Sequence, residues 1–145
     1  MTAGSGTVVW SEVHALKSGD HLQIGRRPGV YRIRAYDLQG SAVAIARVRG
    51  MDALGILHIG KSVDLGVRIR TFRQAAEGLK APHHAGIEFH RWGFGVVFPI
   101  ERLWFDYAIT PDEAEALRLE RMLHEEYRRE FFDRPPLDGT SGQGE

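Results

Sequence analysis

The sequence predicts an α/β fold of the α+β kind, a small and mostly antiparallel sheet flanked by helices. Three observations lead to this class: strand-like alternation in the first half, a short apolar run at 54–60, and one long amphipathic helix near the C-terminus. Strands mostly precede that one clear helix. A parallel sheet, which needs several crossover helices, is therefore not indicated.

Composition is that of an ordinary globular domain. The 145 residues are 43% hydrophobic and 26% charged, which predicts a single domain over 1–145. We expect the core at about 28–138 and flexible ends at 1–6 and 139–145, where residues are small, polar and rich in glycine. The absence of cysteine excludes disulfides and thiolate metal sites. With no membrane-length apolar run and no secretory pattern at the start, we expect a cytoplasmic protein.

Three stretches have the pattern of strands. Residues 28–37 follow a Pro-Gly turn and alternate, with apolar side chains on one face and arginines on the other. Residues 41–50 repeat this alternation after the turn signal Gln39-Gly40. Residues 54–60 are short and apolar and predict a more buried strand.

Helix signals come next. Ser62 is a candidate cap for a helix over about 63–77, and Thr110 with Pro111 predicts the start of a helix that ends at about Phe131. Between them, 79–93 indicates loop with one short extended piece, and 94–109 indicates two short strands interrupted at Pro99.

Charge is distributed unevenly along the chain. The net charge is zero, which does not indicate a globally basic nucleic-acid binder. Residues 1–100 nevertheless carry 13 Lys plus Arg against 7 Asp plus Glu, whereas 101–145 carry 6 against 12. The first hundred residues are thus the better candidates for contacts with phosphate.

The string from Gly55 to Ser62 matches G-x-x-x-x-G-K-[ST], the phosphate loop of nucleotide hydrolases. Such a loop needs small flexible residues between its glycines, and here they are the bulky Ile-Leu-His-Ile of 56–59. Asp106, after an apolar run, is a superficial match to the acidic residue such enzymes also need. We favour a strand that ends in a Gly-Lys-Ser turn, with a nucleotide hydrolase as the weaker alternative.

Five short pieces then stand in a characteristic order. They are Gly29-Val30-Tyr31, His58-Ile59-Gly60-Lys61-Ser62, Leu65-Gly66-Val67-Arg68, the helical Ala116-Leu117-Arg118-Leu119-Glu120-Arg121-Met122-Leu123, and Pro135-Pro136-Leu137-Asp138. In this order they resemble the GIY-YIG nuclease family over about residues 28–138. The resemblance implies a metal-dependent endonuclease that hydrolyses DNA phosphodiester bonds.

The resemblance also implies roles for individual residues. Tyr31 activates the attacking water, helped by His58 or Lys61, while Arg68 steadies the phosphate and Glu120 binds Mg²⁺ or Mn²⁺. DNA is the implied partner, and Ser62, Arg70 and His84 are candidate contacts with it.

The residues themselves leave alternatives open. Glu120 stands in an apolar helical stripe, so its carboxylate is either a metal ligand or paired with an arginine. Arg68 lies at the edge of such a stripe, where its stem alone could cover apolar surface. The histidines at 83, 84 and 90 match no common zinc spacing, and a loop towards DNA or an ordinary polar loop is the better interpretation.

Three positions depart from the family pattern. Phe72 stands where many relatives have a histidine, His58 replaces the second tyrosine, and Asp138 replaces the closing asparagine. These departures favour the alternative of a catalytically inactive nucleic-acid-binding module. A chain this short leaves DNA specificity to loops, a homodimer or a protein partner.

Overall fold

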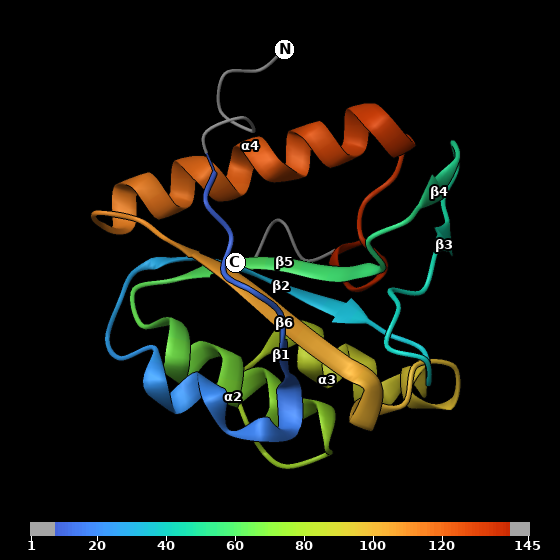
Figure 1. Cartoon of the computed structure of the whole chain (residues 1–145), viewed down its shortest axis with the longest axis horizontal. Helices are drawn as coiled ribbons and strands as arrows, with labels where there is room; N and C mark the ends of the chain where they lie inside the picture. Colours follow the sequence, from blue (N-terminus) through green and yellow to red (C-terminus); the bar gives the residue numbers. More distant parts are fainter. Residues whose placement is uncertain (1–7, 140–145) are drawn as a thin grey trace.

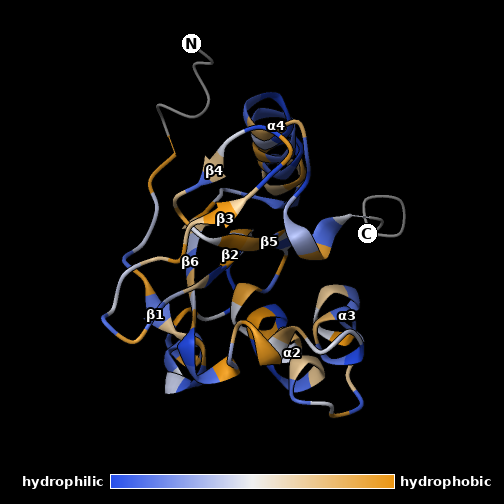
Figure 2. Cartoon of the chain, turned by 90° about the vertical axis from the view of Figure 1, so that its right-hand side faces the viewer, coloured by the Kyte–Doolittle hydropathy of each residue, from blue (hydrophilic) through white to orange (hydrophobic). Residues whose placement is uncertain are grey.

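The computed structural model describes residues 8–139. The predicted flexible end at 1–6, and the predicted end at 139–145 apart from Gly139, therefore lie outside the described residues. Three layers make up the fold: α4 covers one face of the central sheet, and α2 and α3 cover the other (Figures 1 and 2). The helices and strands are β1 His14–Ala15, β2 Gly29–Ala35, β3 Ile45–Ala46, β4 Met51–Asp52, β5 Ile56–Ser62, α2 Leu65–Ala76, α3 His84–Arg91, β6 Leu103–Ile109 and α4 Glu113–Phe131.

The main sheet has the strand order β1-β6-β2-β5, and every pair in it is antiparallel. This arrangement confirms the predicted fold class. In the register of β2, Tyr31 lies opposite Tyr107 of β6 on one side and opposite Gly60 of β5 on the other. β5 therefore ends the sheet, and its outer edge must be covered by something other than a strand.

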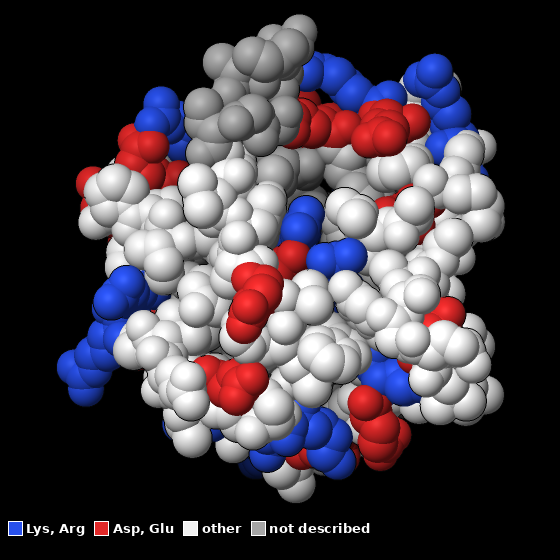
Figure 3. Space-filling model, in the orientation of Figure 1, with Lys and Arg blue, Asp and Glu red and all other residues white. Residues whose placement is uncertain are grey.

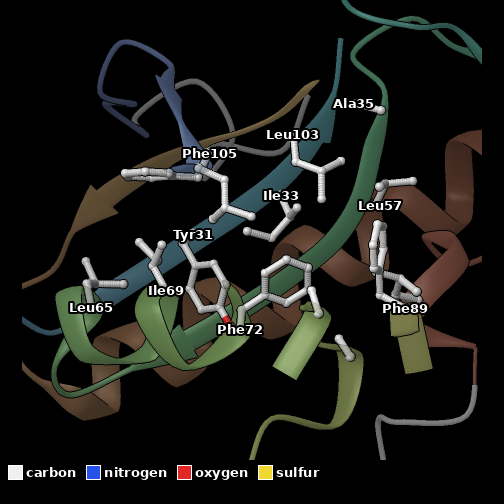
Figure 4. Close-up of a cluster of buried hydrophobic side chains, with 14 of the residues drawn as sticks. Tyr31, Ile33, Ala35, Leu57, Leu65, Ile69, Phe72, Phe89, Leu103 and Phe105 are labelled. Carbon is white, nitrogen blue, oxygen red and sulfur yellow. The ribbon is translucent and has the colours of Figure 1, made fainter. Parts of the chain in front are cut away.

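Two apolar clusters hold the layers together. The larger lies between the sheet and α2 with α3, and Figure 4 shows Tyr31 of β2 projecting into it between Ile69 and Phe72 of α2. The smaller joins β5 to α4 through Ile59, Tyr127 and Phe131. β5 is thus packed on both faces, as its apolar sequence requires.

Two strand predictions were wrong. Residues 41–50 form only the two-residue β3, because most of this stretch is exposed and Ile45 alone is buried. In the stretch 94–109 there is one strand, β6, preceded by two short 3-10 turns at Phe94–Val96 and Ile100–Arg102. Gly93 with its left-handed φ of 70° and Pro99 interrupt the backbone there.

The two predicted helices exist, but their caps lie elsewhere. Asp64 rather than Ser62 caps α2, and Asp112 rather than Thr110 caps α4, in each case by accepting a hydrogen bond from the backbone three residues on. α4 ends at Phe131 as predicted. None of the helices within residues 8–139 is long and apolar enough to cross a membrane.

The helix α3 contradicts the predicted loop at 79–93. Its N-cap is His83, whose imidazole accepts from the Gly86 amide. Histidine is not a preferred cap, so this start carries no ordinary sequence signal.

Candidate active site

Tyr31 lies at the centre of a buried polar cluster on the α2 side of the sheet. Its hydroxyl oxygen Oη is 3.0 Å from Nε2 of His58 and 2.6 Å from Nε2 of His83. All three side chains are at most 5% exposed. These polar groups satisfy one another inside an otherwise apolar core, as buried polar groups must.

His58 connects Tyr31 to the C-terminal segment. Its Nδ1 is 2.5 Å from Oδ1 of Asp138, which belongs to the 3-10 turn Pro136–Asp138. The Phe72 ring stacks with the imidazole, with ring centroids 6.1 Å apart and planes 6° from parallel. The contact with the Asp138 carboxylate and the stacking with Phe72 together restrict the orientation of this histidine.

His83 is a neutral imidazole. Burial first, and then electrostatic interactions with His58 and Arg68, hold the pKa of His83 far below its ordinary value. Its ring also meets Phe72 edge to face, with centroids 5.2 Å apart. Phe72 thus packs against both histidines that contact Tyr31.

Glu120 of α4 and Lys61 of β5 lie close enough to interact electrostatically. Glu120 is half-buried on α4, and burial raises the pKa of its carboxyl group above the usual range. Electrostatic interactions with His124, Lys61 and His58 act in the opposite direction, and Asp138 adds to the rise. The Glu120 carboxylate therefore interacts with Lys61 and, through His58, with the Tyr31 cluster.

Arg68 lies at the entrance to α3. One terminal nitrogen of its guanidinium, Nη1, donates to the carbonyl of Pro82 at 3.0 Å, and its charge is among those that lower the pKa of His83. It therefore lies beside the Tyr31 cluster.

At Ile59, the side chains of Asp138 and His124 satisfy the backbone amide and carbonyl on the outer edge of β5. The Ile59 amide donates to Oδ2 of Asp138 at 2.9 Å, and the Ile59 carbonyl lies 3.0 Å from Nε2 of His124. These bonds replace the neighbouring strand that an edge lacks. Asp138 thus satisfies the sheet edge and His58 at the same time.

The three predicted DNA contacts are not brought into this cluster. The Ser62 hydroxyl is engaged with the backbone of Asp64, donating to its carbonyl and accepting from its amide. Arg70 is exposed two residues beyond Arg68, about 200° around the helix, and its charge acts on His21 instead. His84 is exposed, whereas its neighbour His83 is the buried member of the pair.

Sequence reasoning assigned no role to His83, Asp138 and His124 in the site. His83 was noticed only within the histidine cluster at 83, 84 and 90, and Asp138 only as the closing element of the family pattern. His124 lies one helical turn after Glu120, and this i+4 spacing is the one signal that places it on the same face.

The metal that the family resemblance implies has one candidate ligand. The described residues hold no group of three or more His, Cys, Asp and Glu side chains suited to a metal ion. Glu120 forms no hydrogen bond or ion pair with any other residue in the range 8–139, so its oxygens remain available to a cation. A single carboxylate fits Mg²⁺ or Mn²⁺, because Mg²⁺ is commonly held by one or two carboxylates with substrate phosphate and water.

The segment that matched a phosphate loop is a strand. Residues Ile56–Ser62 pair with β2 along their length, as the bulky residues predicted. Their backbone amides therefore do not form a loop that wraps phosphate.

Charge on the surface is mixed. Figure 3 shows Lys and Arg interspersed with Asp and Glu over the face seen there, and acidic side chains gather along α4. The basic side chains on this face are therefore scattered rather than gathered into one basic surface.

Comparison with models of known families, with curated proteins and with solved structures found no match to this chain.

Proposed function

We propose that this chain is a metal-dependent endonuclease that hydrolyses DNA phosphodiester bonds. In this proposal Tyr31 accepts the proton of the attacking water with the help of His58 or Lys61. Arg68 binds the phosphate and stabilises the charge that builds up on its oxygens. The local basic side chains of residues 1–100 bind the DNA backbone, so affinity should fall as salt rises.

One observation carries the proposal. Five residues predicted to act together come from β2, β5, α2 and α4 and lie close to one another. Tyr31 is hydrogen-bonded to His58, and both Lys61 and His58 interact electrostatically with Glu120. Arg68 interacts electrostatically with His83, which also contacts Tyr31. Two groups at this place, Glu120 and His83, have a shifted pKa, and perturbed titratable groups gathered together are typical of catalytic sites.

Glu120 is the residue that would hold Mg²⁺ or Mn²⁺. The ion supplies positive charge that polarises the phosphate and stabilises the leaving oxygen. Lys61 and His124 partly offset the rise that burial causes in the pKa of Glu120, and a bound cation would favour the ionised carboxylate further.

A second candidate function is a nucleic-acid-binding module without catalysis. The observation that favours it is the burial of Tyr31, which is only 1% exposed. A side chain that accepts a proton from water at the scissile phosphate must be accessible to solvent and substrate. A residue that only supports a binding surface can be fully buried.

The test is cleavage of plasmid and branched DNA with Mg²⁺ or Mn²⁺ by the wild type, Glu120→Gln and Tyr31→Phe. We expect each substitution to reduce the cleavage rate by about a hundredfold or more, the contribution typical of one acid-base group. Glu125→Gln, an exposed change on the same helix, and Tyr36→Phe are matched controls that should cleave like the wild type.

Cleavage that survives in both site variants would refute the residue assignments. No cleavage by the wild type, together with DNA binding that weakens with salt, would instead establish the binding module.

A further inference from the structure

Two departures from the family pattern contact each other. His58 replaces a tyrosine and Asp138 replaces an asparagine, and the structure places Nδ1 of the first 2.5 Å from Oδ1 of the second. They are 80 residues apart in the chain. A histidine and an aspartate form a pair in which one carboxylate oxygen accepts the imidazole proton, so the two replacements complement each other chemically.

This contact sets the protonation of His58. An ionised carboxylate only accepts hydrogen bonds, so Nδ1 of His58 carries the proton. The other oxygen of Asp138 accepts from the Ile59 amide, which holds the carboxylate in place. In the neutral imidazole, Nε2 is then an acceptor, and the Tyr31 hydroxyl lies 3.0 Å from it.

His83 has the opposite tautomer. Its Nδ1 accepts from the Gly86 amide at 3.2 Å, so the proton of the neutral ring is on Nε2. That nitrogen is 2.6 Å from Oη of Tyr31 and donates to it. The Tyr31 hydroxyl therefore accepts a hydrogen bond from His83 and donates one to His58.

We propose that Asp138, His58 and His83 form a relay that prepares Tyr31 to lose its hydroxyl proton to Nε2 of His58. Asp138 is a positioning residue that fixes the His58 tautomer, and His83 is a positioning residue that stabilises the phenolate by its N–H donor. The catalytic role of the relay rests on the proposed nuclease function. Within that function, the relay makes His58 rather than Lys61 the group that accepts the Tyr31 hydroxyl proton.

The proton balance closes over one turnover. The Tyr31 O–H bond breaks and an N–H bond forms at His58 Nε2, leaving a phenolate and an imidazolium ion. The phenolate takes a proton from the water whose oxygen bonds to phosphorus, and the bond between phosphorus and the leaving oxygen breaks. The leaving oxygen receives the proton of the imidazolium through solvent, which restores both side chains.

The relay is tested by long-range ¹⁵N–¹H NMR of the imidazole rings at neutral pH. His58 and His83 are assigned from the signals lost in His58→Gln and His83→Gln. We expect a protonated Nδ1 with a bare Nε2 for His58, and the reverse for His83. A His58 ring with a proton on Nε2, alone or on both nitrogens, would overturn the relay.

Asp138→Asn tests the positioning role. The Ile59 amide needs an acceptor, so the new amide oxygen turns to it and the NH₂ group donates to Nδ1 of His58. His58 should then carry its proton on Nε2, and the kcat for DNA cleavage should fall by about a hundredfold or more with KM little changed. Asp112→Asn keeps its helix cap and is the matched control, expected to behave as the wild type.

The outcomes separate the two proposals. An Asp138→Asn variant that keeps both the His58 tautomer and the wild-type kcat refutes the relay. The wild-type spectrum tests the tautomers even where the variant fails to fold. The expected tautomers in a protein that cleaves no DNA with either metal support the hydrogen-bond relay and refute the nuclease.

Discussion

Gly60 decides whether Tyr31 and His58 can meet. A Cβ atom at this position would lie 2.7 Å from the Tyr31 hydroxyl and 2.8 Å from Nε2 of His58, closer than real contacts allow. Gly60 lies directly opposite Tyr31 in the register of β2 and β5, so the approach follows from strand pairing. Both ring systems are buried and held by other partners, so neither can move aside at low cost.

Gly60→Ala should therefore break the hydrogen bond between Tyr31 and His58. We expect a loss of about 1–3 kcal/mol in the free energy of unfolding, which is typical of an overpacked core, and at least a tenfold loss of DNA cleavage. Urea unfolding and cleavage rates measure the two effects. Gly95→Ala is the control, because its Cβ would meet only Phe89 at 3.7 Å. Equal behaviour of the two variants would show that Gly60 has no special role.

At the scale of elements, Asp52 connects the β4–β5 turn to the helix that carries Glu120. Asp52 is 1% exposed and accepts from the Leu54 and Ile56 amides and from the Tyr127 hydroxyl at 2.8 Å. Burial and this hydrogen bond raise the pKa of Tyr127 well above its usual range, so the donor stays protonated. Tyr127 is two turns after Glu120 on the same face of α4, so the bond helps to fix where Glu120 lies along β5.

Tyr127→Phe removes one hydrogen bond to a charged group, and Asp52→Ala removes three. We expect losses of about 1.5–3 kcal/mol for the first and more for the second, which also leaves two amides without their acceptor. Chemical denaturation with circular dichroism provides the values. If the Asp52→Ala variant were no less stable than Tyr127→Phe, the amide bonds of Asp52 would contribute nothing to holding the turn.

At the scale of the whole molecule, two buried histidines couple stability to pH. Burial lowers the pKa of both His21 and His83, with Arg73 as the next cause for His21 and His58 for His83. The folded protein therefore leaves them neutral, while the unfolded chain protonates them near 6.5. As pH falls through that value, the unfolded state binds more protons, so the free energy of unfolding must decrease.

Each such histidine contributes a slope of up to about 1.4 kcal/mol per pH unit. We expect urea unfolding at pH 7.5 and at pH 5.5 to show this decrease in the wild type. His83→Gln should remove one proton from the linkage and make the difference between the two pH values smaller. His84→Gln, a change at the exposed neighbour, should leave it unaltered. An unchanged difference in His83→Gln would mean that His83 is protonated in the folded state.

Patterns that repeat within one element were predictable. The alternation of 28–37 and the apolar run at 54–60 correspond to β2 and β5, and the periodic stretch after Pro111 corresponds to α4 with its end at Phe131. Burying one face of a strand or helix imposes a local period, which can be read without knowing the partner. The alternation of 41–50 does not produce a long strand, because only Ile45 and Val43 of this stretch pack on the core and the rest is exposed or half-exposed.

The site was predictable only in part. The residues at Tyr31, His58, Lys61, Arg68 and Glu120 were named from short motifs, and the structure links them. Ser62, Arg70 and His84 are engaged elsewhere: the Ser62 hydroxyl bonds to the backbone of Asp64, Arg70 is turned about 200° around α2 from Arg68, and His84 is exposed.

By itself the sequence determined the fold class and the elements that carry the motifs, since both follow from periodicity and local turn chemistry. Only the tertiary structure decided that His83 rather than another histidine contacts Tyr31, and that Asp138 both closes the edge of β5 and orients His58. These contacts join residues 52 and 80 positions apart. No local pattern encodes them, because they depend on where α3 and the C-terminal turn pack against the sheet.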